Sequence, residues 1–135
     1  MTGESGTENM TTNKTVLIVD DDDLVLESID LLLSGAEGFQ SIRALGAEGA
    51  MRHMRHAPID IVVADVILAG TVSGIDLCHE AIKRYPDVAL VVITADTEVH
   101  LHDIPSRGVF LRKPFGATEL LVALQMAQRK VENHP

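Results

Sequence analysis

The chain has 135 residues, which is enough for one domain with a buried core and too few for two ordinary domains. Hydrophobic residues make up 46% of the chain and aromatic residues only 3%, so the core must consist mainly of Val, Ile, Leu and Ala, as in parallel sheets covered by helices. The net charge of −9, from 20 acidic and 11 basic residues, makes a nucleic acid or an anionic membrane a poor partner.

The start of the chain shows no targeting signal. Residues 1–13 are rich in Thr, Gly, Glu and Asn and lack the charged and apolar regions of a signal peptide, so we expect a disordered tail. The single cysteine, Cys78, excludes an internal disulfide and fits a reducing compartment. No apolar stretch approaches the roughly 20 residues that span a bilayer. A cytoplasmic protein without membrane insertion is therefore expected.

Beyond the tail, apolar runs alternate with amphipathic segments, which is typical of successive βαβ crossovers on a parallel sheet. In chain order we expect a strand at 15–19, a helix at 23–34, a weak strand at 41–44, a helix at 47–56, a strand at 59–64, a helix at 74–85, a strand at 89–94, a strand at 109–111 and a helix at 117–130. Pro105 leaves room for only one or two helical turns between the last two strands. The sequence therefore predicts one α/β domain with a stunted fourth crossover.

Polar residues stand where these expected strands end. Four consecutive aspartates, Asp20 to Asp23, follow the first strand, and carboxylates packed this closely repel one another unless a divalent cation or a lysine neutralises them. In an open parallel sheet, ligands bind at the carboxyl ends of the strands. One edge of the sheet would then collect the side chains of Asp20, Asp21, Asp65, Thr94 and Lys113.

Five short motifs carry a resemblance to a known family. They are VLIVDDD at 16–22, IVVAD at 61–65, SGIDL at 73–77, VITA at 92–95 and FLRKPF at 110–115. In this order and spacing they resemble the receiver domain of bacterial response regulators, the phospho-accepting module of two-component signalling systems. The resemblance covers residues 14–131 and leaves a short C-terminal tail at 132–135. It implies a flavodoxin-like, doubly wound, five-stranded parallel sheet with strand order 2-1-3-4-5.

The resemblance also implies which residues handle the phosphoryl group. Asp65 matches the aspartate that accepts it from a histidine kinase or a phosphotransfer protein. Thr94 and Lys113 match residues that contact the bound phosphoryl group. Phe110 matches the aromatic residue that turns inward on activation, and the Lys113–Pro114 peptide is expected to be cis, as proline allows. Such a domain would switch protein contacts and catalyse only its own phosphorylation and slow dephosphorylation.

A metal site is implied next to the acceptor. Asp20 and Asp21 resemble the acidic pair that holds Mg²⁺, and Asp65 and the backbone carbonyl of Ile67 would complete the protein ligands. Mg²⁺ prefers octahedral oxygen coordination and keeps several waters, so a few protein oxygens suffice. The ion and Lys113 would offset the charge on the phosphoryl oxygens, in a reaction that depends mostly on positioning and electrostatics.

The chain departs from the family pattern in two places. Ala69 stands where many receivers carry a proline, and Gly74 is one residue further from Asp65 than usual, so we expect a reshaped loop. The stretch 94–113 is about one helical turn short, which predicts a shortened fourth helix. Receivers fused to hybrid sensor histidine kinases often share this shortened stretch, and the resemblance is expected to be closest there.

Two other functions are compatible with parts of the sequence. Asp20 and Asp22 form the Asp-x-Asp pattern of Mg²⁺-dependent phosphohydrolases that use an aspartyl-phosphate, although Leu24 replaces the expected threonine and the chain is too short for a cap domain. A phosphorylation-dead interaction module is disfavoured because every expected catalytic position is filled. The initiating Met1 and the tail favour a stand-alone protein over a piece of a sensor kinase.

Overall fold

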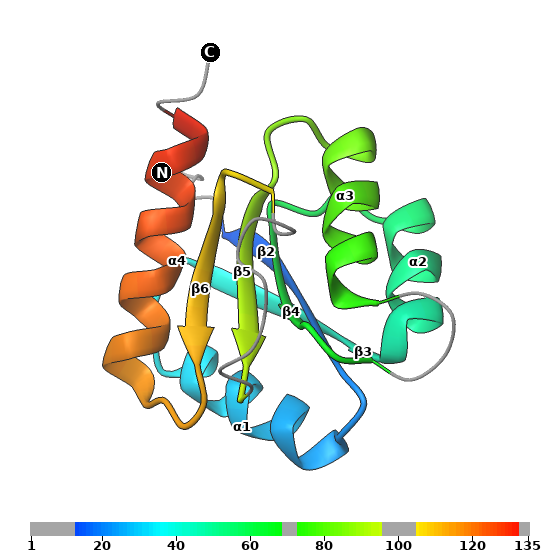
Figure 1. Ribbon diagram of the computed structural model, residues 1–135. Coiled ribbons are helices and arrows are strands. Elements are labelled where there is room, and N and C mark those ends of the chain that lie inside the picture. The colour runs from blue at the N-terminus through cyan, green and yellow to red at the C-terminus, as the bar shows by residue number, and fades with distance from the viewer. Residues whose placement is uncertain (1–12, 69–72, 96–104, 133–135) are drawn as a thin grey trace, which may run out of the picture.

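The computed structural model describes residues 13–68, 73–95 and 105–132, which form a parallel sheet with helices on both faces (Figure 1). The strands are β2 (Lys14–Asp20), β3 (Phe39–Leu45), β4 (Ile61–Asp65), β5 (Ala89–Thr94) and β6 (Gly108–Arg112). They lie in the order β3-β2-β4-β5-β6, and each neighbouring pair is parallel. Counted along the chain this is the order 2-1-3-4-5, so the predicted flavodoxin-like fold is confirmed.

Helices cover both faces of the sheet. They are α1 (Asp23–Ser34), α2 (Gly46–His56), α3 (Gly74–Arg84) and α4 (Ala117–Glu132). The helices α1 and α4 pack on one face and α2 and α3 on the other, as Figure 1 shows. Because both faces are covered, the inner strands carry continuous apolar runs instead of an alternating pattern, as in residues 89–93 of the fully buried β5. No helix among residues 13–68, 73–95 and 105–132 is long and apolar enough to cross a membrane.

The observed boundaries differ from the expected ones mainly at the edge strand. β3 runs from Phe39 to Leu45, whereas its apolar content predicted only residues 41–44. Each of its seven residues pairs with one on β2, from Lys14 to Asp20, so the neighbouring strand extends β3 beyond its own apolar residues. Helix α1 has the predicted bounds, and Asp22 caps it by accepting the Leu24 N–H.

Some expected features fall outside the described residues. These are the tail at 1–12, the residues after Glu132, the Ala69 position in the loop after β4, and the shortened helix that was expected between β5 and β6, whose span includes residues 96–104. Just before β6, the chain turns through a hydrogen bond from the Gly108 N–H to the Pro105 carbonyl.

The register of the sheet brings the strand ends to one level. Val19 pairs with Ala64, so Asp20 and Asp65 each follow a paired residue on neighbouring strands. On the next strands, Thr94 pairs with Arg112, which puts Lys113 directly after the last pair. The carboxyl ends of four strands therefore meet at one edge, as a parallel sheet requires.

Two polar ties hold helices in place away from that edge. The Tyr85 hydroxyl, just after α3, lies within hydrogen-bonding distance of the carbonyl oxygens of Met54 and Ala57 at the end of α2. Asp30 on α1 accepts hydrogen bonds from Ser41 and Arg43 on β3. These contacts link each helix to its neighbour in addition to the apolar core.

Candidate functional site

Three charged side chains meet at the carboxyl edge of the sheet. The Lys113 ammonium, after β6, donates a hydrogen bond to Asp65 Oδ2 at 2.9 Å. The same nitrogen lies 3.5 Å from Asp20 Oδ2, close enough for an ion pair. Asp20 ends β2 and Asp65 ends β4, which are adjacent strands. The structure thus brings together three residues that the sequence placed on separate segments.

Asp20 is the most buried of the three. The residue is only 4% exposed, and its Oδ1 accepts a hydrogen bond from the Asp22 N–H at 2.9 Å. Its Oδ2 is buried and has no hydrogen-bond partner in the structure. Burial raises the pKa of Asp20, the nearby charge of Asp65 adds to the rise, and the Asp22 N–H and Lys113 oppose it. This buried carboxylate oxygen accepts no hydrogen bond and has only the 3.5 Å ion pair with Lys113, so it is suited to bind a further cation.

Asp65 is held at both of its oxygens. Oδ1 accepts the Ile67 N–H at 2.9 Å, and Oδ2 accepts the Lys113 ammonium. The side chain remains 15% exposed, so the carboxylate is accessible from solvent while its direction is fixed. The residue after it, Val66, donates its N–H to the Ile93 carbonyl at 2.9 Å, which extends the strand ladder by one bond.

The remaining aspartates of the acidic run serve different purposes. Asp22 is exposed and caps α1. Asp21 is also exposed, and its Oδ1 lies beside Gly46 at the start of α2, where an added Cβ would come within 3.4 Å of it. The use of Asp22 as a helix cap removes it from the Asp-x-Asp pair that a phosphohydrolase would need. This geometry argues against that alternative.

Lys113 and Thr94 are joined through the backbone. The Lys113 N–H donates to the Thr94 carbonyl at 2.9 Å, and Thr94 is buried at the end of β5. Burial lowers the pKa of the Lys113 ammonium, but its hydrogen bond to Asp65 and the charges of Asp65 and Asp20 outweigh burial and raise that pKa. The following Lys113–Pro114 peptide is cis, as the family resemblance implied. Lys113 therefore stays a cation at any ordinary pH.

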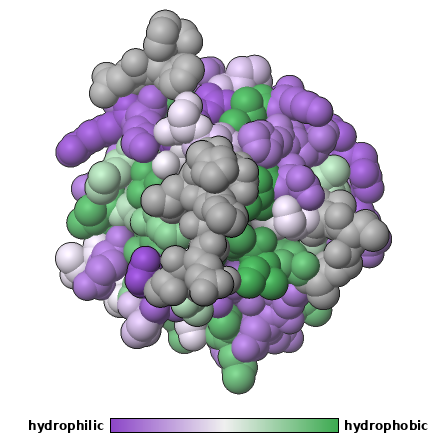
Figure 2. Space-filling model, in the orientation of Figure 1, coloured by the Kyte–Doolittle hydropathy of each residue, from purple (hydrophilic) through white to green (hydrophobic). Residues whose placement is uncertain are grey.

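Phe110 and Ile67 occupy positions at the border of the site. Phe110, on β6, is half-buried and packs against the core on the face of α2 and α3. Ile67 is exposed, and its backbone N–H, as noted, contacts Asp65. Figure 2, in the orientation of Figure 1, shows hydrophobic surface on both sides of the grey residues near the middle of the view and mostly hydrophilic surface toward the rim.

The chemistry of the site fits a hard divalent cation. Among the described residues, no three Asp, Glu, His or Cys side chains converge as tightly as a centre made only of side chains would require. Mg²⁺ does not need such a centre, because it also accepts backbone carbonyls and waters. The observation that favours a cation here is Asp20 Oδ2, which is buried and accepts no hydrogen bond.

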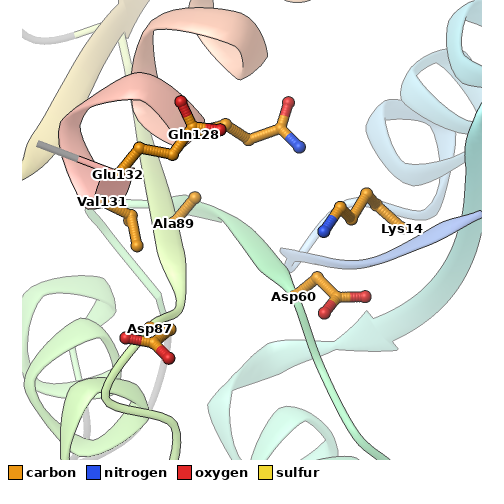
Figure 3. A pocket seen from close by; sticks show the side chains of 7 residues that line it. All are labelled: Lys14, Asp60, Asp87, Ala89, Gln128, Val131 and Glu132. Atoms are coloured by element: carbon orange, nitrogen blue, oxygen red, sulfur yellow. The ribbon is translucent and has the colours of Figure 1, made fainter.

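A separate pocket lies at the opposite edge of the sheet. The pocket has a volume of about 350 Å³. Figure 3 shows the side chains that line it, which come from β2, β5, the segments before β4 and β5, and the end of α4. The lining residues are Lys14, Asp60, Asp87, Ala89, Gln128, Val131 and Glu132. The Asp60 carboxylate accepts the Thr15 N–H at 2.8 Å, which explains its presence by the start of the sheet. The pocket is remote from the residues that the sequence singled out.

The fold and the site together define an α/β domain with an acidic centre at the carboxyl edge of its sheet. The family model of the response regulator receiver domain matches residues 16–125. The chain therefore belongs to the response regulator receiver family of two-component systems.

Relatives and solved structures agree with this assignment. The chain is 30% identical over 128 residues to the DNA-binding response regulator MtrA of Mycolicibacterium smegmatis, a match that covers 93% of this chain and 55% of that protein. It is 28% identical over 119 residues to the heme response regulator HssR of Staphylococcus saprophyticus, covering 86% and 52% respectively. The chain thus spans about half the length of these relatives. A signal receiver domain of an HD domain-containing protein from Pseudomonas fluorescens shares the fold, with a TM-score of 0.77 at 23% identity, covering 90% of this chain and 99% of that one.

The expected closeness to receivers of hybrid sensor kinases stays a prediction.

Two features of the site were not expected from the sequence: the close packing of Gly74 on the end of β4, and a capping box in which Ser73 and Asp76 bond each other's backbone N–H groups. The Ser-x-x-Asp spacing before an apolar helix is a sequence signal that would have revealed the second.

Proposed function

We propose that residues 14–131 form a phospho-accepting receiver domain that takes a phosphoryl group onto Asp65 with the help of Mg²⁺. The donor would be a histidine kinase or a phosphotransfer protein, and the product would be a switch in protein–protein contacts. The observation that carries the proposal is Asp20 Oδ2, which is buried without a hydrogen bond beside the Asp65–Lys113 ion pair and lies 3.5 Å from the same ammonium. This arrangement leaves a cation ligand next to an oriented, accessible carboxylate.

Asp65 would act as the nucleophile. One of its oxygens supplies the electron pair of a new O–P bond, while the bond between phosphorus and the donor's imidazole nitrogen breaks and its electron pair returns to the nitrogen. The imidazole leaves as the acceptor of a proton, and Asp65 carries an acyl phosphate. The contacts from the Ile67 N–H and Lys113 favour a fixed direction of attack.

Lys113 and Thr94 would stabilise the transferred group. The ammonium that now contacts Asp65 Oδ2 would face the phosphoryl oxygens once that carboxylate is phosphorylated. Thr94 stands at the end of the next strand, and its hydroxyl would donate to a second phosphoryl oxygen. Neither residue needs to change its protonation state, because both act as hydrogen-bond donors.

Mg²⁺ would be held by four protein groups: the carboxylates of Asp20, Asp21 and Asp65 and the backbone carbonyl of Ile67. When bound, Mg²⁺ neutralises charge on the phosphoryl oxygens during transfer. Without that neutralisation, a phosphoryl dianion would approach three carboxylates balanced by one lysine. The partly exposed edge leaves room for the waters that Mg²⁺ retains.

The signal would leave the site along β6. Lys113 follows the last residue of this strand, and Phe110, three residues earlier, is only half-buried against the α2 and α3 face. A shift of Lys113 toward a phosphoryl group would pull the end of β6 and favour a more buried position of Phe110. The surface around Phe110 would then change its affinity for a partner protein.

The proposal includes neither nucleic-acid binding nor membrane insertion by these residues, and it places the protein in the cytoplasm. The relative MtrA is named a DNA-binding protein, but the match covers only 55% of its length. The net charge of −9 disfavours phosphate contacts by this chain itself.

Intact-mass spectrometry after incubation with acetyl phosphate and Mg²⁺ tests the proposal. The wild-type protein should gain the mass of one phosphoryl group, and EDTA should prevent the gain. Asp65→Asn should gain nothing, whereas Asp22→Asn, a change of the same kind at the helix cap, should label like the wild type. Full labelling of Asp65→Asn, or labelling that EDTA leaves untouched, would refute the assignment.

A further inference from the structure

Gly74, the first residue of α3, packs directly against the peptide between Asp65 and Val66. A Cβ at this position would lie 1.8 Å from the Asp65 carbonyl oxygen, 2.8 Å from its carbon and 2.9 Å from Val66 Cα. All three atoms belong to the backbone, so no side chain can move aside. The positive-φ glycines among the described residues are Gly38 and Gly46, so Gly74 is required for space and not for its backbone conformation.

Hydrogen bonds at the same contact hold the residue after β4, Val66, between the start of α3 and the end of β5. The Gly74 N–H donates to the Val66 carbonyl at 3.0 Å, while the Val66 N–H donates to the Ile93 carbonyl at 2.9 Å. The peptide chain at Val66 is therefore held between α3 and β5. Asp65 precedes this clamped residue and Ile67 follows it, so the direction of both depends on the clamp.

The start of α3 cannot easily retreat to make space. The capping box of Ser73 and Asp76 fixes its first turn. Leu77, Cys78 and Ala81 on its inner face are buried in the core against the sheet. Movement of α3 away from β4 would open a cavity along this face. An added Cβ at Gly74 would instead displace the Asp65–Val66 peptide.

We propose that Gly74 is a positioning residue for phosphoryl transfer: its bare Cα lets α3 hold the Asp65–Val66 peptide so that Asp65 and the Ile67 carbonyl face Asp20 and Lys113. This inference rests on the proposed function. In Gly74→Ala the contact must open from 1.8 Å to at least 3.0 Å, a shift of about 1.2 Å. Misplacement of a reacting group by about 1 Å can reduce a rate by roughly a hundredfold.

Gly49 provides a matched control on the neighbouring helix. It lies within α2, and the nearest atoms to a Cβ there would be at the ordinary contact distances of 3.7, 3.8 and 4.0 Å. Labelling by acetyl phosphate, measured by intact mass, should be at least tenfold slower in Gly74→Ala than in the wild type, with a several-fold higher Mg²⁺ concentration for half-maximal rate. Gly49→Ala should match the wild type in both. In the metal-free proteins, amide NMR shifts at residues 65–67 should change in Gly74→Ala and not in Gly49→Ala.

The outcomes separate this inference from the proposed function. A wild type that does not label refutes the function and the inference with it. A wild type that labels, beside a folded Gly74→Ala with the same rate and the same Mg²⁺ requirement, refutes the inference alone. If circular dichroism shows that Gly74→Ala does not fold, hydrogen exchange of the wild type decides. Beryllofluoride with Mg²⁺, a phosphoryl mimic, should slow exchange of the Gly74 amide at least threefold and leave the Gly49 amide unchanged; equal exchange at Gly74 refutes the role.

Discussion

Replacing Asp20 by Asn should stabilise the metal-free protein while weakening the proposed Mg²⁺ site. Asp20 Oδ2 is buried without a hydrogen-bond partner, and leaving a buried polar atom unpaired costs about 1–3 kcal/mol, with more for a charged one. The ammonium of Lys113, 3.5 Å away and partly exposed, returns about 1 kcal/mol of that. Asn would remove the buried charge, and its Oδ1 could still accept the Asp22 N–H. A net gain of about 1–2 kcal/mol in unfolding free energy is expected.

The gain should depend on pH in a defined direction. The pKa of Asp20 is raised above its ordinary value of 3.8, chiefly by burial, so the folded state binds a proton more tightly than the unfolded state does. The stability that this protonation contributes is fully present below pH 3.8 and is lost as the pH rises through the higher folded pKa. The advantage of Asp20→Asn should therefore be small near pH 4 and complete at pH 7.

Thermal melts in EDTA at pH 7, followed by circular dichroism, provide the measurement. A gain of 1–2 kcal/mol corresponds to a melting temperature higher by about 4–8 °C for a domain of this size. Adding Mg²⁺ should raise the melting temperature of the wild type more than that of the variant, since only the wild type keeps the full ligand set. Asp22→Asn is the control, because Asn caps a helix about as well as Asp. If Asp20→Asn melts at or below the wild type in EDTA, the reasoning from the unpartnered oxygen is wrong.

Three further results are expected from groups outside the site. Burial raises the pKa of the Cys78 thiol to about 12, so a thiol reagent at pH 8 should label it only as fast as the protein unfolds; rapid labelling of the native state would contradict this. Tyr85→Phe should lower the unfolding free energy by about 1–2 kcal/mol in urea melts, because the carbonyls at the end of α2 lose the hydrogen bond from the Tyr85 hydroxyl. An unchanged midpoint would show that this hydrogen bond does not contribute to stability. The hydrogen bond from the Ser41 hydroxyl and the charge of Arg43 lower the pKa of Asp30, so the contribution of this carboxylate to stability is present above pH 3.8 and is lost as the pH falls through the lower folded pKa. Asp30→Asn should therefore lower the unfolding free energy at pH 7 and have little effect near pH 2. Equal effects at both pH values would refute the pairing of Asp30 with Ser41 and Arg43.

The inner strands could be predicted well because burial on both faces leaves a simple signal. β5 has the bounds that its apolar run predicted, and α1 runs from Asp23 to Ser34 as expected because a polar cap and Gly35 flank it. β3 was less predictable. Its residues between Phe39 and Leu45 are mostly polar or half-exposed, and pairing with β2 extends the strand in a way that local composition does not record.

The convergence of Asp20, Asp65 and Lys113 followed from one rule, that parallel strands end at the same edge. The details of their contacts did not follow. Whether Asp20 Oδ2 would find a donor depends on the depth of the edge and the reach of Lys113, which are properties of the assembled sheet. The packing of Gly74 on Asp65 depends likewise on how closely α3 approaches β4. The sequence shows a glycine at position 74 but not the Asp65 carbonyl oxygen that packs against its Cα.

The hollow of Figure 3 has a consequence for how this domain can be connected to other modules. Lys14, near the start of the described chain, and Glu132, at its end, line the same pocket at the amino-terminal edge of the sheet. The seven residues of β2 span roughly 20 Å from that edge to Asp20. A module joined directly at Lys14 or Glu132 would therefore start at the edge far from Asp65, and a linker joining these two residues would be short. The domain should tolerate circular permutation, with new ends opened elsewhere, while its acidic edge stays uncovered.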